Sequence, residues 1–152
     1  QIINSKRNPV RVKKSSLGKS LTVREVGKEL TAQYEEHILL DIQEPTIIEN
    51  MVIATSSRSS FRIRIQEYKT DGNIVYGELK YDGTGSLGLT PENMMVHGSS
   101  FFDFLEYDLS HGRYKLALKN HLTFPEGVRI SFVNDYTSTI NYSTLIAGRY
   151  YD

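Results

Sequence analysis

The sequence of 152 residues predicts an all-β fold, an antiparallel β-sandwich of about eight strands with a jelly-roll-like topology. Three observations predict it: hydrophobic and polar residues alternate with a period of two, turn signals separate the alternating segments, and no ten-residue helical pattern lies between them. A jelly roll usually has eight strands in two sheets. The strand order is expected from that count alone, because the sequence does not show which strands pair.

The clearest strand lies at residues 61–66. Phe61, Ile63 and Ile65 alternate there with Arg62, Arg64 and Gln66. A period of two with basic residues on one face is typical of a half-buried strand. The Asp71-Gly72 pair that follows is a turn signal, since glycine readily adopts a positive φ. A second alternating segment covers residues 75–81, so we expect these two segments to form a hairpin.

Six further segments are expected to be strands. They span residues 36–42, 46–55, 101–109, 114–119, 128–132 and 139–150. The segment 101–109 carries three acidic residues, and a period of two puts Glu106 and Asp108 on one face and Asp103 on the other. These three carboxylates therefore do not form a catalytic pair by themselves.

Two stretches resist this interpretation. In residues 22–34, Thr22 and Glu25 fit a helix capping box, whereas Gly27 inside the stretch opposes a helix. We favour a strand–turn–strand around Gly27-Lys28. Residues 82–100 are the longest irregular segment, and long loops in compact domains are often functional. We expect a binding loop there, with these candidate residues: Asp82, Thr84, Glu92, Asn93 and His97.

The formal net charge of zero hides a strong asymmetry. Residues 1–30 hold eight basic and two acidic side chains, whereas the other 122 residues hold ten basic and sixteen acidic ones. A basic segment of +6 on a body of −6 is typical of an interaction tail. We therefore expect a basic N-terminal arm at 1–30 and a sandwich domain at 31–152. The candidate partner-binding residues are Lys6, Arg7, Arg11, Lys13, Lys14 and Lys19.

Three destinations for this arm remain open. It can fold back onto its own domain or dock on a neighbouring subunit, and these two are equally favoured. Binding to nucleic acid is the least favoured of the three, even though basic segments attract phosphates.

Several kinds of site are missing from the sequence. There are no cysteines, which excludes disulfide scaffolds, thiolate metal sites and cysteine nucleophiles. The four histidines lack metal-like spacing, and the glycine-flanked His111 is typical of a turn. Gly83-Thr84-Gly85 lacks the Gly-Lys-Ser/Thr ending of a phosphate loop, and no apolar run is long enough to cross a bilayer. We expect no catalytic residues, no metal and no cofactor.

Three segments of the chain resemble a known kind of protein. They are 41–48 (DIQEPTII), 61–65 (FRIRI) with the turn 71–73 (DGN), and 122–128 (LTFPEGV). Together they are similar to the small β-sandwich domains of tailed-bacteriophage virions, which serve as auxiliary capsid, neck or tail components. The resemblance implies location in the virion, protein partners in a symmetric oligomer or lattice, and an N-terminal arm that reaches a neighbour.

The expected function is therefore that of a non-catalytic structural protein of a virion. The alternative is a carbohydrate-binding module that uses residues 82–100 and neighbouring tyrosines. A small metal-dependent sandwich enzyme is a third hypothesis. The chain begins at Gln1 rather than at a methionine, as a processed or trimmed product would.

Overall fold

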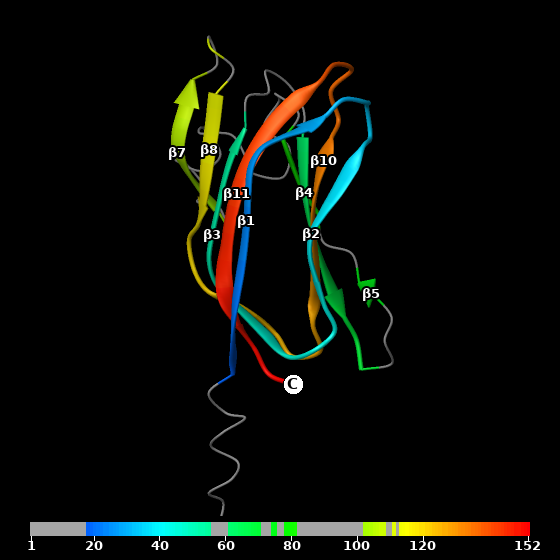
Figure 1. The fold of residues 1–152 in the computed structure, drawn as a ribbon, viewed down its shortest axis with the longest axis vertical. Helices are drawn as coiled ribbons and strands as arrows, with labels where there is room; N and C mark the ends of the chain where they lie inside the picture. The colour runs from blue at the N-terminus through cyan, green and yellow to red at the C-terminus, as the bar shows by residue number, and fades with distance from the viewer. Residues whose placement is uncertain are drawn as a thin grey trace, which may run out of the picture.

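The structure is a computed structural model, and it describes residues 18–55, 61–70, 74–75, 78–81, 102–108, 111 and 113–152. These residues form two β-sheets that pack face to face (Figure 1). All strand pairs that the structure describes are antiparallel. The predicted all-β sandwich is confirmed.

The first sheet has six strands in the order β1-β11-β3-β8-β7, with β9 also paired to β3. Its strands are β1 (Lys19–Leu30), β3 (Thr46–Thr55), β7 (Phe102–Asp108), β8 (Arg113–Leu118), β9 (Leu122–Phe124) and β11 (Ile140–Tyr150). The second sheet has five strands in the order β2-β10-β4-β5, with β6 also paired to β4. Its strands are β2 (Glu36–Ile42), β4 (Phe61–Tyr68), β5 (Ile74–Val75), β6 (Glu78–Tyr81) and β10 (Val128–Asn134).

The connections between the sheets are those of a jelly roll. The first four strands alternate between the two sheets, and β10 and β11 return to lie beside β2 and β1. Eight positions make up this frame, because β5 and β6 share one side of β4 while β8 and β9 share one side of β3. Strand β7 adds an outer strand beside β8. The expected hairpin of 61–66 with 75–81 is present as the pairing of β4 with β5 and β6.

The core lies between the inner faces of the two sheets. Phe132 on β10 stacks on Phe61 of β4 with 5.4 Å between ring centroids, and it also contacts Tyr142 of β11 at 4.8 Å. Ile146 on β11 and Met51 on β3 are fully buried, and Ile146, Met51 and the three aromatic residues belong to one hydrophobic core. Each such side chain contributes about 1.5–3 kcal/mol when it is removed from water. The alternation read from the sequence thus produces the buried inner rows of both sheets.

Residues 19–30 differ from what the sequence predicts. The strand–turn–strand around Gly27-Lys28 is wrong, and so is the helix that was its alternative. Strand β1 continues through this point, because β11 pairs on both sides of it, Glu25 with Thr144 and Lys28 with Tyr142. One extra residue, with Val26 and Gly27 opposite Ser143, forms a β-bulge in which Gly27 has a φ of 61° and its N–H donates to Ser143 Oγ at 2.9 Å.

A second bulge, on β7, changes which face of the sheet the acidic residues of this strand occupy. The register against β8 shifts between Phe104 and Glu106, so Asp103 pairs with Ala117 and Glu106 pairs with Lys115. Ala117 and Lys115 are two residues apart on β8 and therefore share a face. The prediction that Asp103 points away from Glu106 and Asp108 is wrong, because the bulged residue Leu105 removes one step of the alternation.

Among the residues that the structure describes, no helix is long and apolar enough to span a bilayer. Both ends of the described chain lie together at one end of the sandwich (Figure 1). There the Nζ of Lys19 lies 2.5 Å from a carboxylate oxygen of Asp152, and the N–H of Tyr151 donates to the carbonyl oxygen of Pro45 at 2.9 Å.

Candidate protein-binding face

The sequence-predicted site residues fall mostly outside the described part of the chain. This holds for Lys6, Arg7, Arg11, Lys13 and Lys14 of the arm, and for Asp82, Thr84, Glu92, Asn93 and His97 of the loop. Lys19 is described and is the first residue of β1, so it belongs to the sheet. Its hydrogen bond and charge pairing with Asp152 raise the pKa of Lys19 and lower the pKa of Asp152. Lys19 therefore binds the chain's own last residue.

The outer face of the six-stranded sheet carries exposed hydrophobic side chains. Val26 on β1 is 66% exposed, Leu105 on β7 is 59% exposed and Leu145 on β11 is 37% exposed. Val26 lies in the bulge of β1 and Leu105 lies in the bulge of β7. Both bulges stand at the same level of the sheet, level with Ser143 and Lys115. Each outer strand thus places a hydrophobic residue on the same face.

Two residues along the strands from the level of the bulges lies a row of directly paired residues, here called the Leu145 row. It consists of Arg24 on β1, Leu145 on β11, Val52 on β3, Ala117 on β8 and Asp103 on β7. Adjacent strands lie about 4.8 Å apart, so the row is about 19 Å long. Its middle is apolar, one end is a guanidinium and the other end is a carboxylate.

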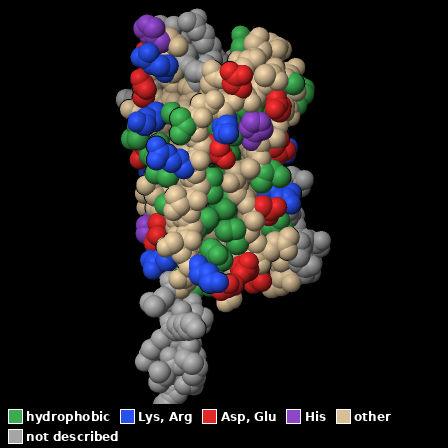
Figure 2. All heavy atoms as spheres, viewed as in Figure 1, with side chains coloured by type: hydrophobic (Ala, Val, Ile, Leu, Met, Phe, Trp, Pro, Cys, Tyr) green, Lys and Arg blue, Asp and Glu red, His purple; other side chains and the backbone are tan. Residues whose placement is uncertain are grey.

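A shallow depression of about 470 Å³ lies over this part of the face. The small side chains of Ala54 on β3 and Ser143 on β11 line it together with Val26, Leu105 and Leu145. Arg24, Glu25 and Lys115 contribute charged groups to the lining. On the left of Figure 2 hydrophobic side chains lie among Lys and Arg side chains. Hydrophobic and charged side chains are therefore mixed in the lining of this depression.

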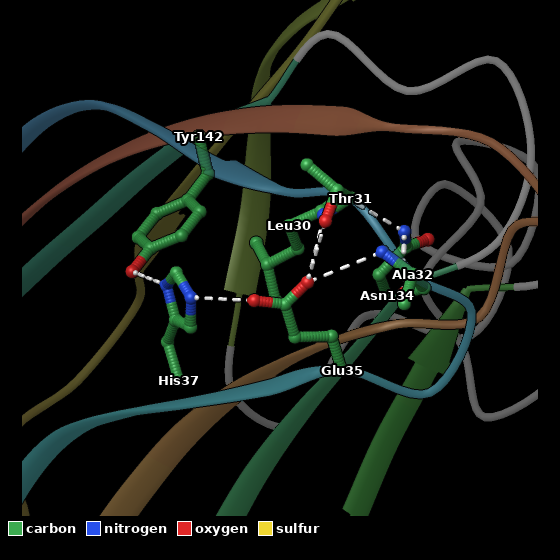
Figure 3. Close-up of polar contacts among 7 residues, drawn as sticks. All are labelled: Leu30, Thr31, Ala32, Glu35, His37, Asn134 and Tyr142. Atoms are coloured by element: carbon green, nitrogen blue, oxygen red, sulfur yellow. Dashed lines mark hydrogen bonds and ion pairs between the residues drawn. The ribbon is translucent and has the colours of Figure 1, made fainter.

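A second feature lies on the side of the sandwich between β1 and β2, where Figure 2 shows hydrophobic side chains gathered in a band. At one end of this side, Glu35, His37 and Tyr142 form a hydrogen-bonded chain (Figure 3). Nδ1 of His37 lies 2.9 Å from the Tyr142 hydroxyl, and Nε2 of His37 lies 3.2 Å from Oε2 of Glu35. The other carboxylate oxygen of Glu35 accepts hydrogen bonds from the N–H groups of Thr31, at 2.7 Å, and Ala32, at 3.1 Å.

A carboxylate, an imidazole and a hydroxyl in this order resemble a proton relay, so their electrostatics decide what they can do. Hydrogen bonds from the backbone of Ala32 and Thr31 lower the pKa of Glu35, and His37 adds to this effect. Burial raises the pKa of Tyr142 to about 12, with a smaller contribution from the charge of Glu25. Tyr142 therefore stays a neutral phenol at physiological pH and is not activated as a nucleophile. The hydrogen bonds of Glu35, His37 and Tyr142 instead connect the β1–β2 connection to β11.

The sequence interpretation missed this network. Glu35 and His37 are two residues apart, which places them on one side of an extended segment, and that spacing is a usable signal. Tyr142 is 105 residues away from His37 and carries no such signal. Its place beside β2 follows from the pairing of β1 with β11.

Metal binding has no support within the described ranges, which contain no group of three His, Asp or Glu side chains suited to hold an ion. At the β7–β8 turn, Nδ1 of His111 lies 2.7 Å from Asp108, and the guanidinium of Arg113 lies 3.4 Å from the same carboxylate, so this carboxylate is held by ion pairs. The turn position predicted for His111 is confirmed.

No family model matches the chain, and no curated protein matches it either. Among solved structures, a chain in the structure of the Gx strain of infectious bursal disease virus is similar, with a TM-score of 0.45 and 12% identity over 88% of this chain and 32% of that chain. A chain of the Gt strain structure gives a TM-score of 0.42 and 12% identity over 88% and 33%. This chain spans about a third of the length of those chains. Likeness at this level does not bear on function.

Proposed function

We propose that this chain is a non-catalytic structural protein that assembles with other protein subunits in a virion. One observation carries the proposal: Val26, Leu105 and Leu145 are exposed together on one face of a sandwich whose core is already filled from both sheets. Clustered hydrophobic side chains at a surface mark sites of association. Removing them from water on contact contributes roughly 25 cal/mol for each Å² buried.

The charge distribution supports a second contact through the N-terminal residues. Residues 1–17 hold five basic and no acidic side chains, and the remaining residues hold thirteen basic and eighteen acidic ones. Segments of +5 and −5 on the same chain attract each other between subunits as well as within one. In the proposal, Lys6, Arg7, Arg11, Lys13 and Lys14 lie on an acidic surface of a neighbouring subunit, with Pro9 favouring extended backbone. Lys19 is left out, because it pairs with Asp152.

The placement in a virion rests on the resemblance of residues 41–48, 61–65 with 71–73, and 122–128 to phage virion sandwich domains, and the jelly-roll fold is compatible with it. The carbohydrate-binding alternative concerns residues 82–100, which lie outside the described residues, and no described residue favours it.

The test is the native mass of the intact chain and of a variant lacking residues 1–14, measured by light scattering at low and high salt. Strand β1 begins only at Lys19, so the deletion leaves the described sandwich intact. We expect the intact chain to exceed the monomer mass, and the deletion to lower that mass most clearly at low salt, where charges are least screened.

A variant with glutamine at the five basic positions keeps the length and controls for the loss of backbone. A monomeric intact chain at all concentrations would contradict assembly as the function. An unchanged oligomer after deletion at both salts would contradict the role of the arm alone.

A further inference from the structure

We propose that the outer face of the six-stranded sheet binds a second copy of this chain, about a two-fold axis that runs along β3. The inference rests on the proposed assembly function and names the partner of its hydrophobic face. It depends on the Leu145 row, whose residues are fixed by strand pairing.

The first argument is charge. In a two-fold dimer the same surface meets itself. An axis along β3, in the plane of contact, exchanges β1 with β7 and β11 with β8, because these strands stand symmetrically about β3 in the sheet. Arg24 at one end of the row then faces Asp103 of the second copy, and the reverse pair forms at the other end. An axis across the strands would instead place Arg24 against Arg24.

The second argument is that these two charges are available. The side chain of Arg24 is exposed and makes no hydrogen bond or ion pair to another described residue. Asp103 has an exposed side chain and one ion pair, to Lys119 at 4.0 Å, which is the outer limit of such a contact. Face-to-face sheets cross at about 30°, which displaces the row ends by a few Å. The long side chain of Arg24 spans that displacement.

The third argument is shape. The same axis places Leu145, which stands out from the sheet, opposite the small Ala117 of the second copy, and it places Val52 against Val52. The bulge residue Val26 approaches Leu105 of the second copy, because both bulges are at the same level. The most exposed hydrophobic side chains of this face are therefore covered in pairs, and large residues meet small ones.

The experiment exchanges the two charges. We expect the variants Arg24→Asp and Asp103→Arg each to weaken self-association at least tenfold in sedimentation equilibrium, since each sets like charges against each other. We expect a mixture of the two single variants to form a heterodimer, because opposite charges then meet in both contacts: Asp at 24 meets Arg at 103 in one, and the native Arg24 meets Asp103 in the other. The double variant in one chain restores the homodimer for the same reason.

Lys69→Asp is the matched control, because it reverses an exposed charge beyond the end of β4 in the other sheet. It should leave self-association unchanged. A geometric readout uses the absence of natural cysteines. Val52→Cys should give covalent dimers with a short bismaleimide, whereas Lys69→Cys should not.

Two results would overturn the inference. One is self-association that is insensitive to both single variants; the other is two weakened variants that fail to combine with each other. In either case, if the intact chain still assembles, the proposed function stands and only the face and axis are wrong. If the intact chain is monomeric throughout, the proposed function fails with it.

Discussion

The side-chain amide of Asn134 donates a hydrogen bond to the carbonyl oxygen of Leu30 at 3.1 Å, which joins the end of β10 to the end of β1. The same amide nitrogen lies within 3.2 Å of the carbonyl oxygens of Ala32 and Ser138, and its oxygen accepts the N–H of Tyr136 at 2.7 Å. One buried side chain therefore holds the β1–β2 connection against the β10–β11 connection. This contact positions Glu35 and His37 over Tyr142.

Replacing Asn134 with Ala should lower the free energy of unfolding by about 3 kcal/mol, because several buried polar groups lose their partner together. Urea unfolding followed by circular dichroism measures it. The control is Gln33→Ala, whose exposed side chain donates to the carbonyl oxygen of Asp135 at 3.3 Å and should cost less than about 0.5 kcal/mol. Equal losses in the two variants would contradict the central place given to Asn134.

Two glycines should respond differently to a methyl group. A Cβ at Gly148 would overlap the carbonyl oxygen of Ile47 on the neighbouring strand, so Gly148→Ala should cost about 3 kcal/mol or prevent folding. At Gly27 a Cβ would meet nothing within 4 Å, and only its φ of 61° opposes alanine. Gly27→Ala should cost about 1 kcal/mol. Thermal unfolding of both variants checks the order, and the reverse order would contradict the register between β3 and β11.

Tyr142 should make stability depend on alkaline pH. Its folded pKa of about 12 is above that of an unfolded tyrosine, so its contribution is complete below the unfolded pKa and is lost as the pH rises through the folded value. Tyr142→Phe removes this dependence and also the hydrogen bond to His37, which is worth about 1 kcal/mol at neutral pH. The difference in unfolding free energy between the native chain and Tyr142→Phe should therefore be smaller at pH 11 than at pH 8. A constant difference would contradict the raised pKa.

Glu35 should make stability depend on acidic pH in the opposite direction. Its pKa is lowered by the N–H groups of Ala32 and Thr31, so its contribution is present above the ordinary carboxyl range and is lost as the pH falls through the folded value. Glu35→Gln should be less stable than the native chain at pH 7, and the difference in unfolding free energy should shrink as the pH is lowered towards 3. Glu126→Gln, in an exposed turn, serves as the control and should differ at neither pH.

Alternation alone was sufficient to predict most strands of this fold. Phe61, Ile63 and Phe132 are buried as their period of two predicts, because a strand in a sandwich has one face toward the core. The bulges were not predictable to the same degree. Gly27 gave a signal, which was interpreted as a turn, and Leu105 gave none, since a bulge adds a residue without requiring a special one.

The candidate face was harder to predict than the fold. The Leu145 row takes one residue from each of five strands, of which only β7 and β8 are consecutive in sequence, and the strand order of the sheet brings them together. The sequence identified charge asymmetry, which is a property of composition along the chain. It could not identify the neighbours of Leu145, because those depend on pairing partners and register.

The two bulges also bear on how this protein avoids the wrong kind of association. Within the described part of the chain, β1 and β7 are the outer strands of their sheet. A straight outer strand exposes unpaired N–H and C=O groups, so strands of other molecules can pair with it one after another. A bulge breaks the even spacing of free N–H and C=O groups, so an incoming strand cannot pair along the whole length. The bulges thus oppose the addition of strands at both edges of this sheet, and in the proposed dimer the contact is made by a face that closes after two copies have met.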